Sequence, residues 1–117
     1  MENKKLNDSE LQLRRMVNAY AEDVNNGKMK FFPNNEDVVD DTNGDQYYEA
    51  YSIKYIIGDD GSFHDVMIML AGGGPTIWLD TWRQEIRGSW GCDTYTKYIY
   101  DHDYILDYWE EQYQCIR

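Results

Sequence analysis

The sequence predicts an α+β fold, in which an antiparallel four- to five-stranded meander is flanked by an N-terminal and a C-terminal helix. Apolar residues recur at helical spacing near both ends of the chain. Between them, short runs rich in aromatic and β-branched residues alternate with glycine-containing turns. The length of 117 residues is the usual size of one domain, so we expect residues 1–117 to form a single domain.

The first helix is predicted from about residue 8 to residue 25. Polar residues 7–10 provide cap candidates and an acid for the first turn. An apolar stripe then follows at spacings of four, three and four, formed by Leu13, Val17, Tyr20 and Val24. Gly27 is expected to end the helix in a left-handed conformation, and residues 28–46 are expected to be irregular.

The central part of the chain predicts the sheet. Alternating or continuous apolar runs indicate strands over residues 47–57, 63–71, 76–81, 85–90 and 95–100. Turns are expected at residues 58–62 and 72–75, where glycines are available for positive φ. The continuous run Val66–Leu70 predicts a central strand that is buried on both faces.

The second helix is predicted to follow Asp101, which we expect to act as its cap. Ile105, Tyr108, Trp109 and Tyr113 recur at helical spacing and predict its buried face. The acids of this segment are expected to point outward.

The charge of the chain is unevenly distributed. The net charge is −11, and residues 36–65 carry nine acids against Lys54 alone. A second stretch, residues 101–111, carries acids only. A solvated surface explains many acidic runs, but solubility requires a magnitude of only about 2–8. Such a field repels nucleic acid and anionic membranes and attracts basic partners, so we expect neither direct nucleic-acid binding nor membrane binding.

The compartment is predicted to be the cytoplasm of the host cell. No window reaches the roughly 18 consecutive apolar residues that span a membrane, and residues 1–13 lack an apolar signal region. Cys92 and Cys115 fit no metal spacing, and in a reducing compartment we expect both to be free thiols.

No catalytic or metal-binding constellation is evident, and we expect neither enzymatic activity nor a cofactor. His64 and His102 are expected at the surface or at a helix cap, and nothing in the sequence ties Cys92 to a base. Residues 41–45 open like a calcium loop, but Gln46 and Ser52 occupy the positions that need glycine and glutamate.

Two further features have a structural interpretation and a functional one. Gly72–Pro75 lacks the Lys-Ser/Thr of a phosphate-binding loop, which favours a bulge or a tight turn. The tryptophans could line a ligand pocket, but a small domain needs large core side chains. We therefore expect at least three tryptophans in the core and Trp82 to be exposed.

Residues 70–81, with the sequence LAGGGPTIWLDT, and residues 85–91, EIRGSWG, resemble a group of small phage and mobile-element proteins. The resemblance covers roughly residues 65–115 and includes the acidic aromatic segment 108–113. It implies a host-defence antagonist of the anti-CRISPR or anti-restriction kind, several of which are acidic mimics of nucleic acid. It supports the fold more than the mechanism.

These observations lead to an acidic inhibitor that acts as a DNA mimic. It would block the nucleic-acid-binding surface of a basic partner, either a CRISPR effector or a restriction-type enzyme. It would act as a monomer or dimer, with the exposed tyrosines of the first strand as anchors. The alternative is an immunity protein that neutralises a basic toxin or nuclease. The expected partner-binding residues are Asp37, Asp40, Asp41, Asp45, Asp59, Asp60 and Asp65.

Overall fold

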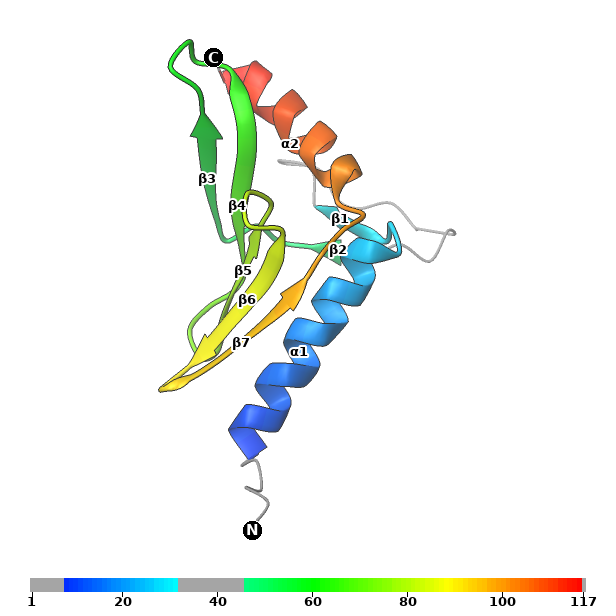
Figure 1. Cartoon of the computed structure of the whole chain (residues 1–117), viewed down its shortest axis with the longest axis vertical. Coiled ribbons are helices and arrows are strands. Elements are labelled where there is room, and N and C mark those ends of the chain that lie inside the picture. The colour runs from blue at the N-terminus through cyan, green and yellow to red at the C-terminus, as the bar shows by residue number, and fades with distance from the viewer. Residues whose placement is uncertain (1–7, 32–45, 117) are drawn as a thin grey trace.

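The computed structural model describes residues 8–31 and 46–116, and these confirm the α+β fold (Figure 1). Two helices flank a five-stranded antiparallel sheet, and a small two-stranded sheet lies beside it. The elements in chain order are α1 (Asp8–Asn25), β1 (Met29–Phe31), β2 (Gln46–Tyr48), β3 (Ser52–Ile57), β4 (Phe63–Ala71), β5 (Thr76–Asp80), β6 (Glu85–Trp90), β7 (Asp93–Tyr98) and α2 (Asp103–Ile116).

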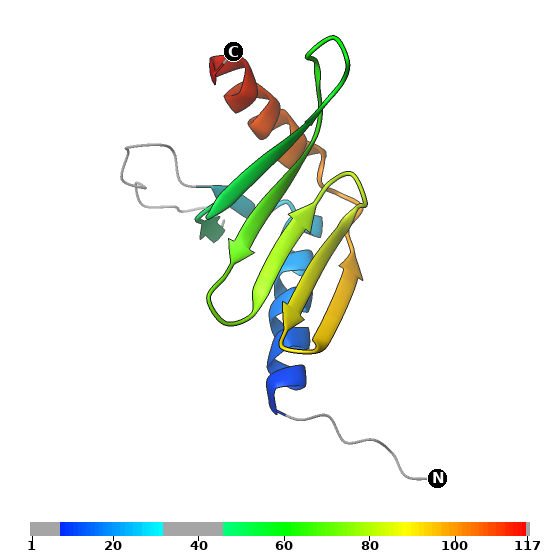
Figure 2. The ribbon, with the colours of Figure 1, turned by 90° about the vertical axis from the view of Figure 1, so that its left-hand side faces the viewer.

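The five-stranded sheet is a simple meander with the order β3-β4-β5-β6-β7, so each strand pairs with its neighbours in sequence. Both helices lie on the same face, as Figure 2 shows with the strands in front of them. α1 crosses β6 and β7, whereas α2 lies against β4. The opposite face of the sheet is not covered by any described helix.

The segment predicted as one strand over residues 47–57 is divided in two. Residues 46–48 form β2, which pairs in parallel with β1, and the meander begins only at Ser52. The prediction that residues 28–46 are irregular was therefore wrong at residues 29–31 and at residue 46, and residues 32–45 lie outside the described residues. Met29 and Phe31 are buried on alternate positions of β1, which makes this short strand part of the core.

The core forms between α1 and the sheet. Leu13, Val17 and Val24 are buried as the predicted stripe requires, together with Ala21, while Tyr20 is half-buried. The closest approach of helix to sheet is at Gly88 in β6. A Cβ atom there would lie 2.6 Å from Cγ2 of Val17 and 2.8 Å from Cδ1 of Leu13. The absence of a side chain at this position lets α1 lie directly on the strand.

The prediction that β4 is buried on both faces was wrong. Its burial alternates, with Val66, Ile68 and Leu70 buried beneath the helices, while Met67 and Met69 are only half-buried. The continuous apolar run therefore has one core face and one face without a covering layer. A register shift between Met69 and Ala71 leads into the exposed turn at 72–74, in which Gly73 has a φ of 87°.

Two tryptophans, rather than three, contribute to the core. Trp109 of α2 is buried and Trp90 packs against the core. Trp78 lies on the uncovered face of the sheet, where the Nζ atom of Lys54 is 5.0 Å from its ring centroid. Trp82 is 62% exposed, as predicted.

α2 begins at Asp103, one residue later than a cap at Asp101 would place it. The carbonyl oxygen of His102 accepts hydrogen bonds from the N–H groups of Ile105 and Leu106, so His102 occupies the capping position. The side chain of His102 is buried at this junction. The N–H of Asp101 donates instead to Oδ1 of Asn25 at the end of α1.

Candidate functional site

The expected partner-binding acids divide into three groups. Asp37, Asp40, Asp41 and Asp45 lie outside the described residues. Asp59 and Asp60 are exposed in the turn between β3 and β4. Asp65 lies in β4, where it is half-buried and accepts a hydrogen bond of 2.9 Å from Oγ1 of Thr81.

The β3–β4 turn presents its acids in a defined geometry. The Oδ1 atom of Asp60 accepts hydrogen bonds from the N–H (3.0 Å) and the hydroxyl (2.6 Å) of Ser62. The N–H of Gly58 donates to the carbonyl of Ser62, and Gly61 adopts a φ of 82°. The hydroxyl of Ser62 lowers the pKa of Asp60, and its N–H adds to the effect. Asp60 is therefore ionised throughout the physiological pH range.

An aromatic cluster attaches α2 to this hairpin. The ring of Tyr113 lies 5.2 Å from that of Tyr55 and 6.1 Å from that of Phe63. The hydroxyl of Tyr113 donates a hydrogen bond of 2.8 Å to the carbonyl of Gly61, in the turn itself. The C-terminal half of α2 therefore lies beside the hairpin tip, as the views in Figures 1 and 2 agree.

This arrangement brings two acidic segments together that are far apart in the sequence. Three of the four exposed acids of α2 lie at positions 107, 110 and 111 and share one helical face, while Asp103 lies in the first turn. We call the combined surface the acidic end; it consists of Asp59, Asp60, Asp107, Glu110 and Glu111. Neither residues 55–82 nor residues 98–116 contain a Lys or Arg. Burial raises the pKa of Tyr108 in α2, and the negative charge of Glu111 raises it further.

Two exposed isoleucines border the acidic end. Ile57 precedes the turn and is 49% exposed, and Ile116 at the end of α2 is 69% exposed. Of the tyrosines of the first predicted strand, Tyr55 packs into the aromatic cluster. Tyr51 is 63% exposed and remains available for contacts. The acidic end thus combines ionised groups with apolar side chains that a partner could cover.

One acid of the sheet, Asp80, has a structural role and pairs with an arginine. Asp80 is only 2% exposed, and its Oδ1 accepts a hydrogen bond of 3.0 Å from the N–H of Arg83. Nη1 of Arg87 lies 3.5 Å from its other oxygen. Asp80 therefore stabilises the turn between β5 and β6, and no pattern in the sequence predicts that this acid is buried.

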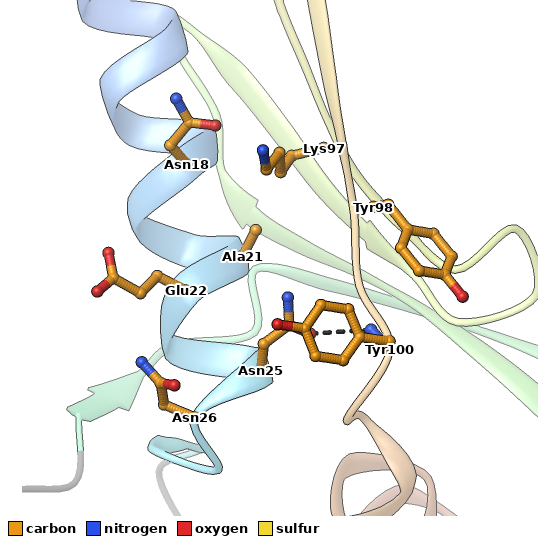
Figure 3. A pocket seen from close by; sticks show the side chains of 8 residues that line it. All are labelled: Asn18, Ala21, Glu22, Asn25, Asn26, Lys97, Tyr98 and Tyr100. Carbon is orange, nitrogen blue, oxygen red and sulfur yellow. Dashed lines mark hydrogen bonds between the residues drawn. The ribbon is translucent and has the colours of Figure 1, made fainter.

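A groove lies between α1 and β7 (Figure 3). Its volume is about 540 Å³, and polar side chains line it together with Ala21 and the rings of two tyrosines. The side chain of Asn25 is fixed in it, because its Oδ1 accepts hydrogen bonds from the N–H groups of Tyr100 (2.9 Å) and Asp101 (3.3 Å). The lining residues are Asn18, Ala21, Glu22, Asn25, Asn26, Lys97, Tyr98 and Tyr100. The sequence reasoning missed this groove, which depends on the path of α1 past the last strand.

The described residues contain no group of three or more His, Cys, Asp or Glu side chains that could hold a metal ion. Cys92 and Cys115 are exposed free thiols, as predicted. His64 is exposed, whereas His102 is 4% exposed and its Nδ1 has no hydrogen-bond partner among the described residues. Cys92 and His102 are separated by the length of β7, roughly 20 Å, which is too far for a nucleophile and its base. Neither described helix combines the length and apolar character needed to cross a membrane.

The described residues form an α+β fold that carries the acidic end and the groove between α1 and β7. No family model, curated protein or solved structure matches the chain. The resemblance to phage-encoded antagonists therefore stays a prediction.

Proposed function

We propose that this chain is a protein inhibitor that binds a basic, nucleic-acid-binding surface of a host-defence effector through its acidic end. The observation that carries the proposal is the convergence of the β3–β4 turn and α2, which places five exposed acids on one end of the molecule without a Lys or Arg in either segment. The inhibitor would exclude nucleic acid by occupying the cationic surface that binds it.

The physical basis is electrostatic attraction followed by apolar contact. A cluster of unpaired carboxylates attracts a cationic surface and accelerates association, in a manner that falls with ionic strength. Exposed ion pairs alone contribute little affinity, on the order of 0–1 kcal/mol each. Ile57 and Ile116 supply apolar area at the same end, and burying such side chains is what lengthens the lifetime of a complex.

The test is a charge-reversal pair with a matched control. Asp59→Lys combined with Glu110→Lys changes the net charge from −11 to −7 at the acidic end. Asp8→Lys combined with Glu49→Lys makes the same change at exposed positions outside it. Both variants should keep the circular dichroism spectrum of the parent, because all four side chains are exposed.

The assay measures nucleic-acid binding by a panel of purified CRISPR effectors and restriction enzymes, with and without each variant, at several salt concentrations. We expect the parent and the control to displace nucleic acid from at least one effector. The acidic-end variant should require about tenfold or more protein, because two attractive charges are replaced by two that repel the cationic surface. Equal loss in both variants would mean that only the net charge matters. If no effector responds and a single basic toxin binds instead, the protein is an immunity protein.

A further inference from the structure

The outer edge of β7 is open to hydrogen bonding. β7 is the last strand of the sheet and pairs on one side only, with β6. The N–H of Ile99 donates to the carbonyl of Gln84, on the β6 side, while the N–H of Tyr100 points the other way, to Asn25. Backbone groups alternate in direction along a strand, so the N–H groups of Thr94, Thr96 and Tyr98 also point away from β6.

The open edge has a defined length. Asn25 occupies the N–H groups of Tyr100 and Asp101, which closes the edge at its C-terminal end. Among the described residues, no side chain or loop caps the N–H groups of Thr94, Thr96 and Tyr98. Exposed edges of this kind are the surfaces to which extended peptides add as a further strand.

The groove between α1 and β7 runs beside this edge (Figure 3). Asn18 and Glu22 of α1 line it, as do Asn26 after the helix and Lys97 of β7. These four side chains can hydrogen-bond to a polar side chain of a ligand. Across the edge lie the rings of Tyr98 and Tyr100, which are 57% and 61% exposed, with centroids 6.0 Å apart.

These observations go beyond the proposed inhibitor function and do not depend on it. We propose that the edge of β7 is a peptide-binding site, which takes an extended segment of a partner protein as a sixth strand of the sheet. The segment carries alternating side chains: aromatic or β-branched residues against Tyr98 and Tyr100, and polar residues in the groove facing α1. A second copy of the chain is a poor occupant, because two molecules of net charge −11 repel each other.

Two substitutions at one position separate backbone pairing from side-chain contact. Thr96→Pro removes the outward N–H and places a ring on the edge, but it leaves the bonds to β6 intact, because that N–H points away from β6. Thr96→Val keeps the N–H and the β-branched shape. The probe is a phage-displayed library of random dodecapeptides, selected on the parent protein, followed by titration of the selected peptide as a synthetic chain.

The selected peptide should show alternating apolar and polar residues and should bind the parent and Thr96→Val equally. Thr96→Pro should weaken binding by at least about tenfold, through the lost hydrogen bond and the steric block. Amide hydrogen exchange of Thr94, Thr96 and Tyr98 in the parent should slow when the peptide is bound. This measurement decides the matter even if Thr96→Pro does not fold.

Three results would overturn the proposal. One is a library that yields no binder above background. Another is a peptide that protects amides elsewhere, for instance in β3 or at the acidic end. The third is protection of the β7 edge that grows with protein concentration in the absence of peptide, which would assign the edge to self-association. The acidic-end variant tests the inhibitor proposal and leaves Thr96 unchanged, whereas Thr96→Pro tests the peptide site. The two experiments therefore show which of the two proposals has failed.

Discussion

Gly88 offers the sharpest test of how α1 packs on the sheet. In the Gly88→Ala variant, the new methyl group would lie 2.6 Å from Cγ2 of Val17 and 2.8 Å from Cδ1 of Leu13. Ordinary contacts between carbon atoms are about 3.5–4.0 Å, so each pair overlaps by roughly 1 Å. Both neighbours are almost completely buried, at 0% and 1% exposure, so they can move only by displacing other core side chains. The helix must therefore shift outward or the two side chains must leave their preferred rotamers.

The expected cost follows from these overlaps. Overpacking of a core by one methyl group costs about 1–3 kcal/mol. Replacing glycine within a strand recovers about 0.5–1 kcal/mol, because the unfolded chain loses conformational freedom. The net loss in the free energy of unfolding should be about 1–2 kcal/mol, which lowers Tm by roughly 3–8 °C for a chain of this size.

The assay is urea-induced unfolding followed by circular dichroism, with two comparison variants. Gly74→Ala serves as the control, because no atom lies within 4 Å of a Cβ there and its φ is not positive. It should stabilise the chain slightly, by about 0.5–1 kcal/mol, because only the loss of freedom in the unfolded chain acts there. In a Val17→Ala background, Gly88→Ala should cost about 1 kcal/mol less, since one of the two clashing groups is gone. If Gly88→Ala is no more destabilising than Gly74→Ala, or if Val17→Ala gives no relief, α1 does not lie directly on β6.

Three other substitutions report on separate contacts. Thr81→Val should lower the free energy of unfolding by about 1–3 kcal/mol in thermal melts, because it strands the buried N–H of Val66, which donates to Oγ1 at 2.9 Å. Burial, together with the hydrogen bond to Asp23, raises the pKa of Tyr48 above its ordinary value of 10.0. The corresponding stability is complete below pH 10.0 and is lost as the pH rises toward the folded-state pKa, so Tyr48→Phe should flatten an alkaline unfolding curve. Tyr113→Phe should speed amide exchange in the turn at residues 58–62 with little loss of global stability, about 0.5–1.5 kcal/mol, and no change there would mean that its hydroxyl does not hold the turn.

The elements of the fold were largely predictable from periodicity and turn residues. The stripe of α1, the hairpin turn at 58–62 and strand β6 lie where the pattern placed them, because local spacing alone determines which face is apolar. The division of residues 47–57 was not predictable, since the parallel pairing of β1 with β2 joins segments that have no local signal for each other. The burial of His102 and Asp80 likewise depends on neighbours supplied by distant parts of the chain.

The candidate surfaces were predictable in part. The sequence shows the acids of the turn and of α2 as two separate runs. Their proximity depends on the contacts of Tyr113, which the helical spacing predicts only as a residue of the buried face of α2. The periodicity of α2 indicated which of its acids face outward. Nothing in the sequence indicates that Asn25 would cap two backbone groups after β7, because that contact spans 75 residues. The open edge and its groove therefore required the three-dimensional structure.

The position of α1 has a consequence for synthesis of the chain. Of the described elements, α1 leaves the ribosome first, yet the strands it covers, β6 and β7, are nearly the last to be made. Each hairpin of the meander closes over a short loop, so the sheet can assemble strand by strand as it emerges. During that interval, on the order of several seconds at ordinary translation rates, the apolar stripe of α1 has no sheet to cover. The nascent helix is thus the segment most exposed to chaperones and to aggregation, and its docking completes the fold.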